Sequence, residues 1–412
     1  MTATLALPRH DFRIIGLLAT AHGFSHFYMV ALPPLFPLLK AEMGVSYAAL
    51  GAIASTVALA SGLAQLPVGF IVDRFGARYV VIAGSAVIAL AYGLMGFAPS
   101  YAWLPALAAL AGLANSVFHP ADYAILSHAI DPKRVGRAFG IHTFSGYIGW
   151  ALAPLLMASL APHIGWRGAI MTAGVLGLAM AAILFTQRGY LSNDIGAKAR
   201  GTTRAADGGP RGASVLLRPG VLVLFGFFVF SSMNSIGINT FSVTALHALH
   251  DLDLRTANVA LTAFLVGAAC GVFVGGFVVD RTTRYEAVAG VGFTVAAAGV
   301  LIIAFLPLPA WAIIATLGLT GSMIGGITPS RDMLVRAMAP KGSAGKVFGF
   351  VSTGIEVGSA TSPVLFGWLL DQGHPALVFI ASAIMMMGAL AGASAAAYFA
   401  RRQAERSTVA AA

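Results

Sequence analysis

Residues 69–78 read GFIVDRFGAR and lie directly after a long apolar run. A shortened copy, GFVVDR, occupies residues 276–281 and also follows an apolar run. Each stretch joins the end of a hydrophobic segment to a short charged loop. The same local sequence pattern therefore occurs in both halves of the chain.

Further residues repeat in the same order at an offset of 209 residues, close to the 207 residues that separate the two copies above. These pairs are His119-Pro120 with Thr328-Pro329, Phe139-Gly140 with Phe348-Gly349, Gly149 with Gly358, and Pro154 with Pro363. A shared order and spacing over this length indicates duplication. Two related halves around a site at the bilayer midplane are typical of secondary transporters.

The composition excludes a water-soluble protein. The 412 residues are 58% hydrophobic and only 10% charged, with a mean hydropathy of +0.84, whereas a soluble domain carries about 25% charged residues. The net charge of +10 does not indicate nucleic-acid binding, because the basic residues lie between apolar runs and form no continuous basic face.

Twelve runs are close to the roughly 20 apolar residues that one membrane crossing needs, and backbone pairing in lipid makes each a helix. They cover about 14–39, 48–72, 79–98, 102–130, 138–161, 166–187, 219–247, 257–279, 286–306, 310–335, 347–370 and 376–400. We predict an all-α membrane protein whose twelve transmembrane helices form two pseudo-symmetric six-helix bundles. The bundles are expected at 1–187 and 219–412, joined by a polar cytoplasmic linker at 188–218.

The distribution of Lys and Arg predicts the orientation. With the N-terminus in the cytoplasm, 21 of the 25 basic residues lie in cytoplasmic segments, three lie on the opposite side, and Arg331 lies inside a span. We therefore expect an integral protein of a bacterial inner membrane with both termini in the cytoplasm.

At residues 69–78 the sequence resembles the major facilitator superfamily, whose signature Gly-x-x-x-Asp-Arg-x-Gly-x-Arg joins the second and third spans. The matching residues are Gly69, Asp73, Arg74, Gly76 and Arg78. In the family this loop helps to hold one side of the transporter closed. The resemblance thus implies a gating role for them, and for Asp280 and Arg281 in the second copy. The alternative is that Arg74 and Arg78 only set the topology.

Two segments resemble the fosmidomycin-resistance-like branch of exporters. One has His22 followed by the prolines of residues 33–37, and the other reads NSVFHP over residues 115–120. The chain departs from that branch at His26, where an acid is usual, and after Pro120, where Ala121 and Asp122 replace a glutamate.

The fifth span carries Gly140, Gly149 and Ala153-Pro154, which resembles the antiporter motif of the superfamily's drug exporters. The match is partial, and the eleventh span repeats the spacing with Gly349 and Gly358. Two interpretations follow: an antiport mechanism, or close helix packing that uses the same glycines.

Polar residues inside apolar spans are costly, so they indicate a cavity or a partner. The resemblance implies that the first, fourth, seventh and tenth spans line a central cavity. We expect Arg331 to bind an anionic substrate group, because its planar guanidinium matches a carboxylate. We expect His26, His119 and Asn234 to orient the substrate.

Glu356 and Asp122 are the predicted proton carriers, since a carboxyl group in a low-dielectric site can hold a proton near neutral pH. Glu356 could instead be a fixed partner of Arg331, and Asp122 could pair with an arginine of the gate. His22 and His142 are expected to pack or to hydrogen-bond. A metal site formed by His22, His26 and His119 has no dedicated ligand spacing, so we expect no metal and no cofactor.

The sequence thus predicts a secondary active transporter, proton-coupled and monomeric, that moves a small organic anion or zwitterion across the bilayer by alternating access. The close alternative is a proton-driven exporter of drug-like compounds. An intramembrane metal-dependent hydrolase and a transporter-like sensor are further alternatives. No nucleophile elbow or HExxH pattern occurs in the chain, so the protein is not expected to be an enzyme.

Overall fold

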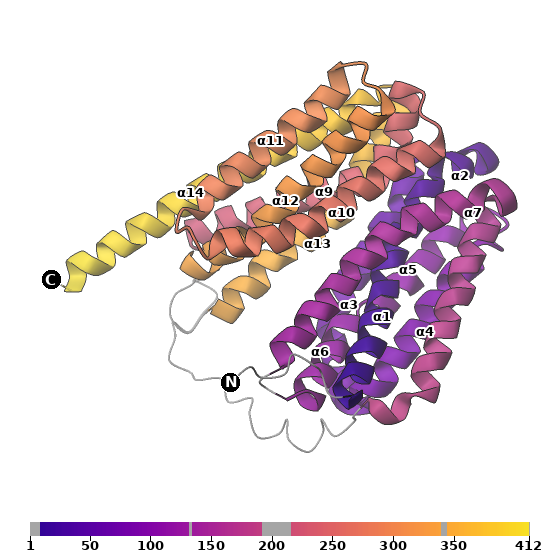
Figure 1. Ribbon diagram of the computed structural model, residues 1–412, viewed down its shortest axis with the longest axis horizontal. Coiled ribbons are helices and arrows are strands. Elements are labelled where there is room, and N and C mark those ends of the chain that lie inside the picture. The colour runs from indigo at the N-terminus through magenta and orange to yellow at the C-terminus, as the bar shows by residue number, and fades with distance from the viewer. Residues whose placement is uncertain (1–8, 132–133, 192–215, 339–343, 412) are drawn as a thin grey trace. The chain divides into compact units, whose positions relative to one another are not determined.

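The computed structural model describes residues 9–131, 134–191, 216–338 and 344–411, and every regular element among them is a helix (Figure 1). The elements are α1 (Arg9–Ala31), η1 (Pro33–Leu35), α2 (Phe36–Met43), α3 (Tyr47–Phe75), α4 (Ala77–Met95), α5 (Trp103–Asn115), α6 (Phe118–Ala129), α7 (Val135–Thr186), η2 (Arg188–Tyr190), α9 (Pro219–His250), α10 (Leu254–Val279), α11 (Tyr285–Phe305), α12 (Ala310–Met338), α13 (Ala344–Asp371) and α14 (Ala376–Ala411). The predicted all-α fold is confirmed.

The helices form two compact units. The first comprises Met1–Leu39 and Thr56–Arg204, and the second comprises Lys40–Ser55 and Ala205–Ala412. In the first unit α7 packs along α1 and α4, and in the second α10 packs along α12 while α9 packs along α13 and α14. Most of the predicted linker lies outside the described residues.

Residues 40–55 belong to the second unit because Asp371, at the end of α13, caps the start of α3. Its carboxylate accepts backbone N–H groups from Tyr47 and Ala48, each at 2.8 Å, and lies 3.3 Å from Lys40 Nζ. The first N–H groups of a helix have no partner within the helix, and an acidic side chain satisfies them.

Ten described helices are long and apolar enough to span a membrane, by length and composition. One of them, α7, has 52 residues and contains non-helical backbone at Gly165, where φ is 67° and ψ is 173°. The two halves of α7 correspond to the predicted spans 138–161 and 166–187. The remaining predicted span, 347–370, lies in α13, which is not among these ten and carries Glu356 and several hydroxyl side chains.

Two predicted spans contain interruptions. The first changes from α1 to η1 at Pro33, and the fourth is divided between α5 and α6 at Ser116 and Val117. Proline has no N–H to complete a helical hydrogen bond, and Pro120 lies four residues after Ser116. The backbone of Ser116 and Val117 stays close to helical values, so α5 and α6 together form one span that carries His119.

The turn at Gly165 needs glycine, because its backbone conformation is essentially inaccessible to residues with a side chain. Arg167, two residues later, donates hydrogen bonds to the carbonyl oxygens of Gly96 and Ala98 at 2.9 and 2.8 Å. These carbonyls lie just after α4, where the last groups of a helix lack partners. Arg167 thereby ties the turn to the end of α4.

Glycine brings α1 and α7 into backbone contact. A Cβ atom at Gly149 would lie 2.0 Å from the carbonyl oxygen of Gly23, so no side chain fits there. The repeat-related Gly358 packs against α9 in the same way, with a Cβ position 2.7 Å from Val229 O. By contrast, a Cβ at Gly140 or Gly349 meets no atom within 4 Å.

A second pair of contacts follows the repeat. A Cβ atom at Gly112 would lie 2.4 Å from Val57 O, and one at Gly321 would lie 1.9 Å from Phe264 O. The first contact joins α5 to α3, and the second joins α12 to α10. The duplication seen in the sequence therefore extends to the contacts that hold each unit together.

Changing Gly149 to Ala should lower the free energy of unfolding of the purified protein by about 2 kcal/mol, because the added methyl group would overlap a backbone carbonyl. Gly140→Ala is the matched control from the same motif and should be neutral or slightly stabilising, because alanine favours helix. Thermal unfolding in detergent measures both variants. Equal melting temperatures would contradict the packing role of Gly149.

Candidate functional site

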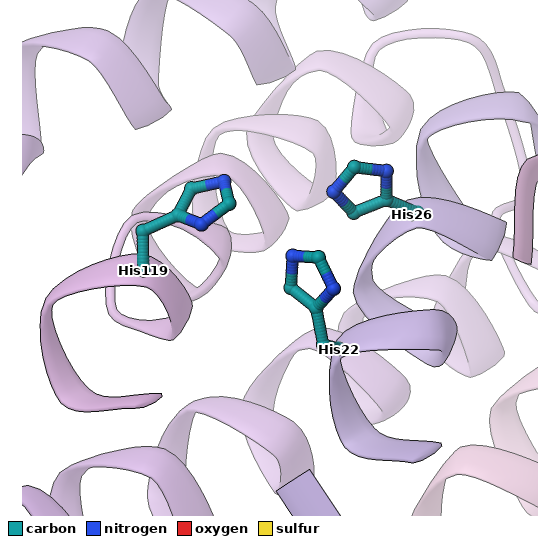
Figure 2. Close-up of side chains that lie close together, drawn as sticks. All are labelled: His22, His26 and His119. Atoms are coloured by element: carbon teal, nitrogen blue, oxygen red, sulfur yellow. The ribbon is translucent and has the colours of Figure 1, made fainter. Parts of the chain in front are cut away.

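Four histidines gather in the first unit. His22 and His26 come from α1, His119 from α6 and His142 from α7. The ring centroid of His22 lies 4.4 Å from that of His26, 5.1 Å from that of His119 and 3.7 Å from that of His142, on which it stacks. Figure 2 shows His22, His26 and His119 turning their rings toward one another.

The helix geometry explains this cluster. His22 and His26 are four residues apart on α1 and therefore share one face. Gly146 of α7 lies opposite them, where a Cβ atom would be 2.9 Å from the His26 ring and 3.0 Å from the His22 ring. Glycine at this position leaves the space that the two imidazoles occupy.

Asp122 forms a buried pair with His142. His142 Nε2 lies 2.9 Å from Asp122 Oδ2, and the exposed fractions of the two side chains are 1% and 0%. The backbone carbonyl of His142 accepts a hydrogen bond from His22 Nδ1 at 3.0 Å. Asp122 is thus connected to the histidine cluster. Its partner is His142, whereas the alternative raised from the sequence was an arginine of the gate.

Aromatic rings lie beside the cluster. The ring of Trp150 is centred 4.5 Å from that of His26, and Tyr147 lies 5.4 Å from Trp150. Tyr123 of α6 lies 5.6 Å from His119 and is exposed. The surroundings of His26 and His119 are therefore both polar and apolar.

Arg331 is the basic residue of interest in the second unit. Its guanidinium lies 4.8 Å above the ring of Phe228 in α9, and its Nε donates to Asp332 Oδ1 at 2.9 Å. The Arg331 side chain is 23% exposed and that of Asp332 is 49% exposed. No ion pair joins Arg331 to Glu356 among the described residues, so the structure does not support the fixed-partner alternative for Glu356.

Glu356 and Asn234 differ in how far they are buried within the second unit. Glu356 is half-buried in α13. Asn234 is fully buried in α9, where its Nδ2 donates to Ser231 O at 2.8 Å. Its Oδ1 has no hydrogen-bond partner among the described residues, although buried polar atoms normally have one.

The signature loop is described only in part. Arg78 Nε donates to the carbonyl oxygen of Leu191, and Gly76 adopts φ 83° between α3 and α4. Arg74 lies over the ring of the adjacent Phe75 at 5.4 Å. A Cβ at Gly69 would meet no atom within 4 Å, and the side chain of Asp73 lies outside the described residues.

The second copy of this loop is exposed. Asp280 and Arg281 follow α10 directly, and both side chains face outward. An apolar groove of about 550 Å³ lies near them between α10, α11 and α12 and includes Cys270 and Arg284 in its walls. None of the predicted substrate or proton residues lines it.

The fold and these polar side chains are those of a membrane transporter: an all-helical integral membrane protein with a few ionisable residues, such as Asp122, Arg331 and Glu356, within its spans. The chain belongs to the major facilitator superfamily, whose sequence profile matches residues 18–254 and 228–412. Family membership confirms the sequence-based resemblance and makes the protein a transporter of small molecules and not an enzyme.

The chain is 28% identical to the fosmidomycin resistance protein of Escherichia coli over 68% of each chain. It is 26% identical to the probable sulfoacetate transporter SauU of Cupriavidus necator over 92% of each chain. Among solved structures, it is similar to an inward-facing, occupied bacterial homologue of the human lysosomal transporter Spinster. The TM-score is 0.76 at 16% identity, over 96% of this chain and 98% of that one.

Sequence reasoning missed several polar contacts of the first unit, and two of them involve a buried aspartate. One is the Asp122–His142 pair, and the other joins Arg134 Nε to Asp11 Oδ2 at 2.8 Å. Both connect residues from different helices, with no fixed sequence spacing. Their charge complementarity was the available signal, but it does not select one partner over another.

A double-mutant cycle on Asp122→Asn and His142→Gln should give a coupling energy of about 1–3 kcal/mol, because both groups are buried and share a charge-assisted hydrogen bond. Reversible unfolding in bicelles measures the four proteins. The same cycle on Arg331→Gln and Asp332→Asn should give less than about 1 kcal/mol, since that pair is partly exposed. Similar coupling energies for the two pairs would contradict the conclusion that burial strengthens the interaction between Asp122 and His142.

Proposed function

We propose that this protein is a proton-coupled secondary transporter that moves a small organic anion or zwitterion by alternating access. The general class follows from the family, whereas the substrate and the coupling ion are inferred from side chains. Each unit contributes a different chemistry: titratable groups in the first, and a guanidinium with a half-buried carboxyl group in the second.

Arg331 carries the anion part of the proposal. Its charge is permanent, and its position in an apolar helix makes an unpaired state costly. The contact with Asp332 is a partly exposed ion pair between adjacent residues, and such pairs contribute only about 0–1 kcal/mol. A substrate carboxylate or sulfonate can therefore replace this contact at small cost, with the ring of Phe228 supporting the guanidinium.

Glu356 and Asp122 are the proposed proton carriers. Glu356 lies half-buried within α13, and Asp122 is buried against His142. A carboxyl group in such a position exchanges its proton only when the local environment changes, which is what a coupled transport cycle requires. His26, His119 and Asn234 are proposed to orient the substrate.

The proposal also includes the membrane in which the protein lies, its orientation, its gate and its oligomeric state. The 21-to-3 distribution of basic residues supports cytoplasmic termini and a bacterial inner membrane. We propose gating roles for Gly69, Asp73, Arg74, Gly76 and Arg78, and for Asp280 and Arg281. A monomer is the proposed functional unit.

A proton-driven exporter of drug-like compounds is the second candidate. The similarity to the fosmidomycin resistance protein favours it, as do Trp150 and Tyr147 beside His26. Aromatic faces suit amphiphilic ligands. In this case Arg331 would have a structural role.

Arg331→Gln should reduce transport of a small organic anion at least tenfold, because a charge-assisted hydrogen bond contributes about 1.5–3 kcal/mol. Sulfoacetate, small carboxylates and amphiphilic drugs are the compounds to test in proteoliposomes. Arg336→Gln is the matched control, since Arg336 is an exposed arginine near the end of the same helix. Unchanged anion transport in Arg331→Gln would remove Arg331 from the substrate site.

Glu356→Gln or Asp122→Asn should abolish accumulation driven by a proton gradient but preserve substrate exchange, because exchange needs no net proton movement. Internal pH and labelled substrate are followed in the same vesicles. Asp251→Asn, which changes an exposed acid directly after α9, should retain both activities. If both test variants still accumulate substrate as the unmodified protein does, the assignment of proton carriers is wrong.

A further inference from the structure

Three histidines of the first unit offer one ring nitrogen each to a common point. His22, His26 and His119 place these nitrogens within 4.8 Å of one another (Figure 2). The sequence spacing gave no metal signature, because His119 comes from α6 and the other two from α1. The fold supplies the proximity that the spacing lacks.

We propose that these three imidazoles bind one divalent transition-metal ion of the zinc type. Zn²⁺ binds histidine nitrogens at about 2.0–2.1 Å, which sets ligand nitrogens about 3.3 Å apart in a tetrahedral site. The rings therefore need to approach one another by up to about 1.5 Å. Rotation about the histidine χ2 bond, which has broad minima, provides such a movement.

Hydrogen bonding prepares His22 as a ligand. Its Nδ1 donates to the carbonyl oxygen of His142 at 3.0 Å, which leaves the lone pair on Nε2. That Nε2 is buried and has no hydrogen-bond partner among the described residues. Metal-binding histidines usually donate their other ring N–H to a carbonyl or carboxylate in this manner, which fixes both the tautomer and the ring orientation.

His26 has the same unused capacity. Its Nδ1 is buried without a partner in the described part of the chain. Histidines that serve only in packing normally satisfy their buried nitrogens. These two nitrogens lie on one helix face, and the His119 ring centroid lies 5.1 Å from that of His22 and 6.2 Å from that of His26. The three rings therefore have unused capacity to bind a shared electrophile.

Asp122 lies behind the cluster and carries a negative charge whenever its proton has been released. It contacts His142 at 2.9 Å, and the His142 ring stacks on His22 at 3.7 Å. A cation bound by the three neutral imidazoles would be partly balanced by this buried carboxylate. Protons suit the cluster less well, because imidazolium rings 4.4–6.2 Å apart would repel one another.

The donor set defines the class of metal. Imidazole nitrogen suits Zn²⁺, Ni²⁺ and Cu²⁺, whereas Mg²⁺ and Ca²⁺ require oxygen ligands. Three protein ligands leave a fourth position open to water or to an anionic group. Metal binding is a property of the first unit alone, so it holds whether or not the proposed substrate class is correct.

The test is a calorimetric titration of the full-length protein in lipid nanodiscs with Zn²⁺, after removal of any affinity tag, and a parallel titration with Mg²⁺. We expect one Zn²⁺ per chain and no saturable Mg²⁺ binding. His26→Gln and His119→Gln should each weaken Zn²⁺ binding at least tenfold. His163→Gln is the control, because His163 is an exposed histidine outside the cluster, and it should bind as the unmodified protein does.

X-ray absorption of the zinc-loaded, unmodified protein keeps the test independent of variant folding. Three imidazole nitrogens at about 2.0 Å support the site. A shell of oxygen ligands, or fewer than three imidazoles, would overturn it. Absence of saturable Zn²⁺ binding, or equal affinity in the two cluster variants and the His163→Gln control, would overturn it as well.

Discussion

Direct backbone contact between helices is the interaction on which this structure depends. Lipid is as apolar as a leucine side chain, so helices in a membrane gain little from hydrophobic burial and associate through close packing. Gly149 against Gly23 and Gly112 against Val57 bring backbones within carbonyl contact distance. Gly321 repeats this arrangement in the second unit. Gly149 of the antiporter-like motif thus has a structural explanation that requires no direction of transport, whereas Gly140 makes no such contact.

The close approach of α1 and α7 also determines the chemistry of the first unit. Gly146 makes room for His22 and His26, and α7 carries His142 to the buried Asp122. The second unit keeps the glycine contacts but replaces these groups. Thr328 stands at the position related to His119, and serine and asparagine occupy the matching part of α9. Duplication has preserved the packing and allowed the polar groups to diverge.

The sequence was sufficient to predict the fold class, because hydropathy, the repeat and the basic residues are local or periodic signals. It did not predict the short interruption between α5 and α6. It identified His22, His26, His119 and Asp122 as unusual, since polar groups are rare in apolar spans. Their partners remained unknown because contacts between separate helices leave no fixed spacing.

The turn at Gly165 has a practical consequence for anyone who modifies this protein. Two membrane helices are joined there through a single residue in a glycine-only conformation, with Arg167 tied to the end of the neighbouring helix. Epitope tags, fluorescent labels and protease sites are tolerated best in exposed loops whose backbone is not held by hydrogen bonds or by a special conformation. The connection at Gly165 is not such a loop, so tags and labels that report topology should be inserted at other helix connections.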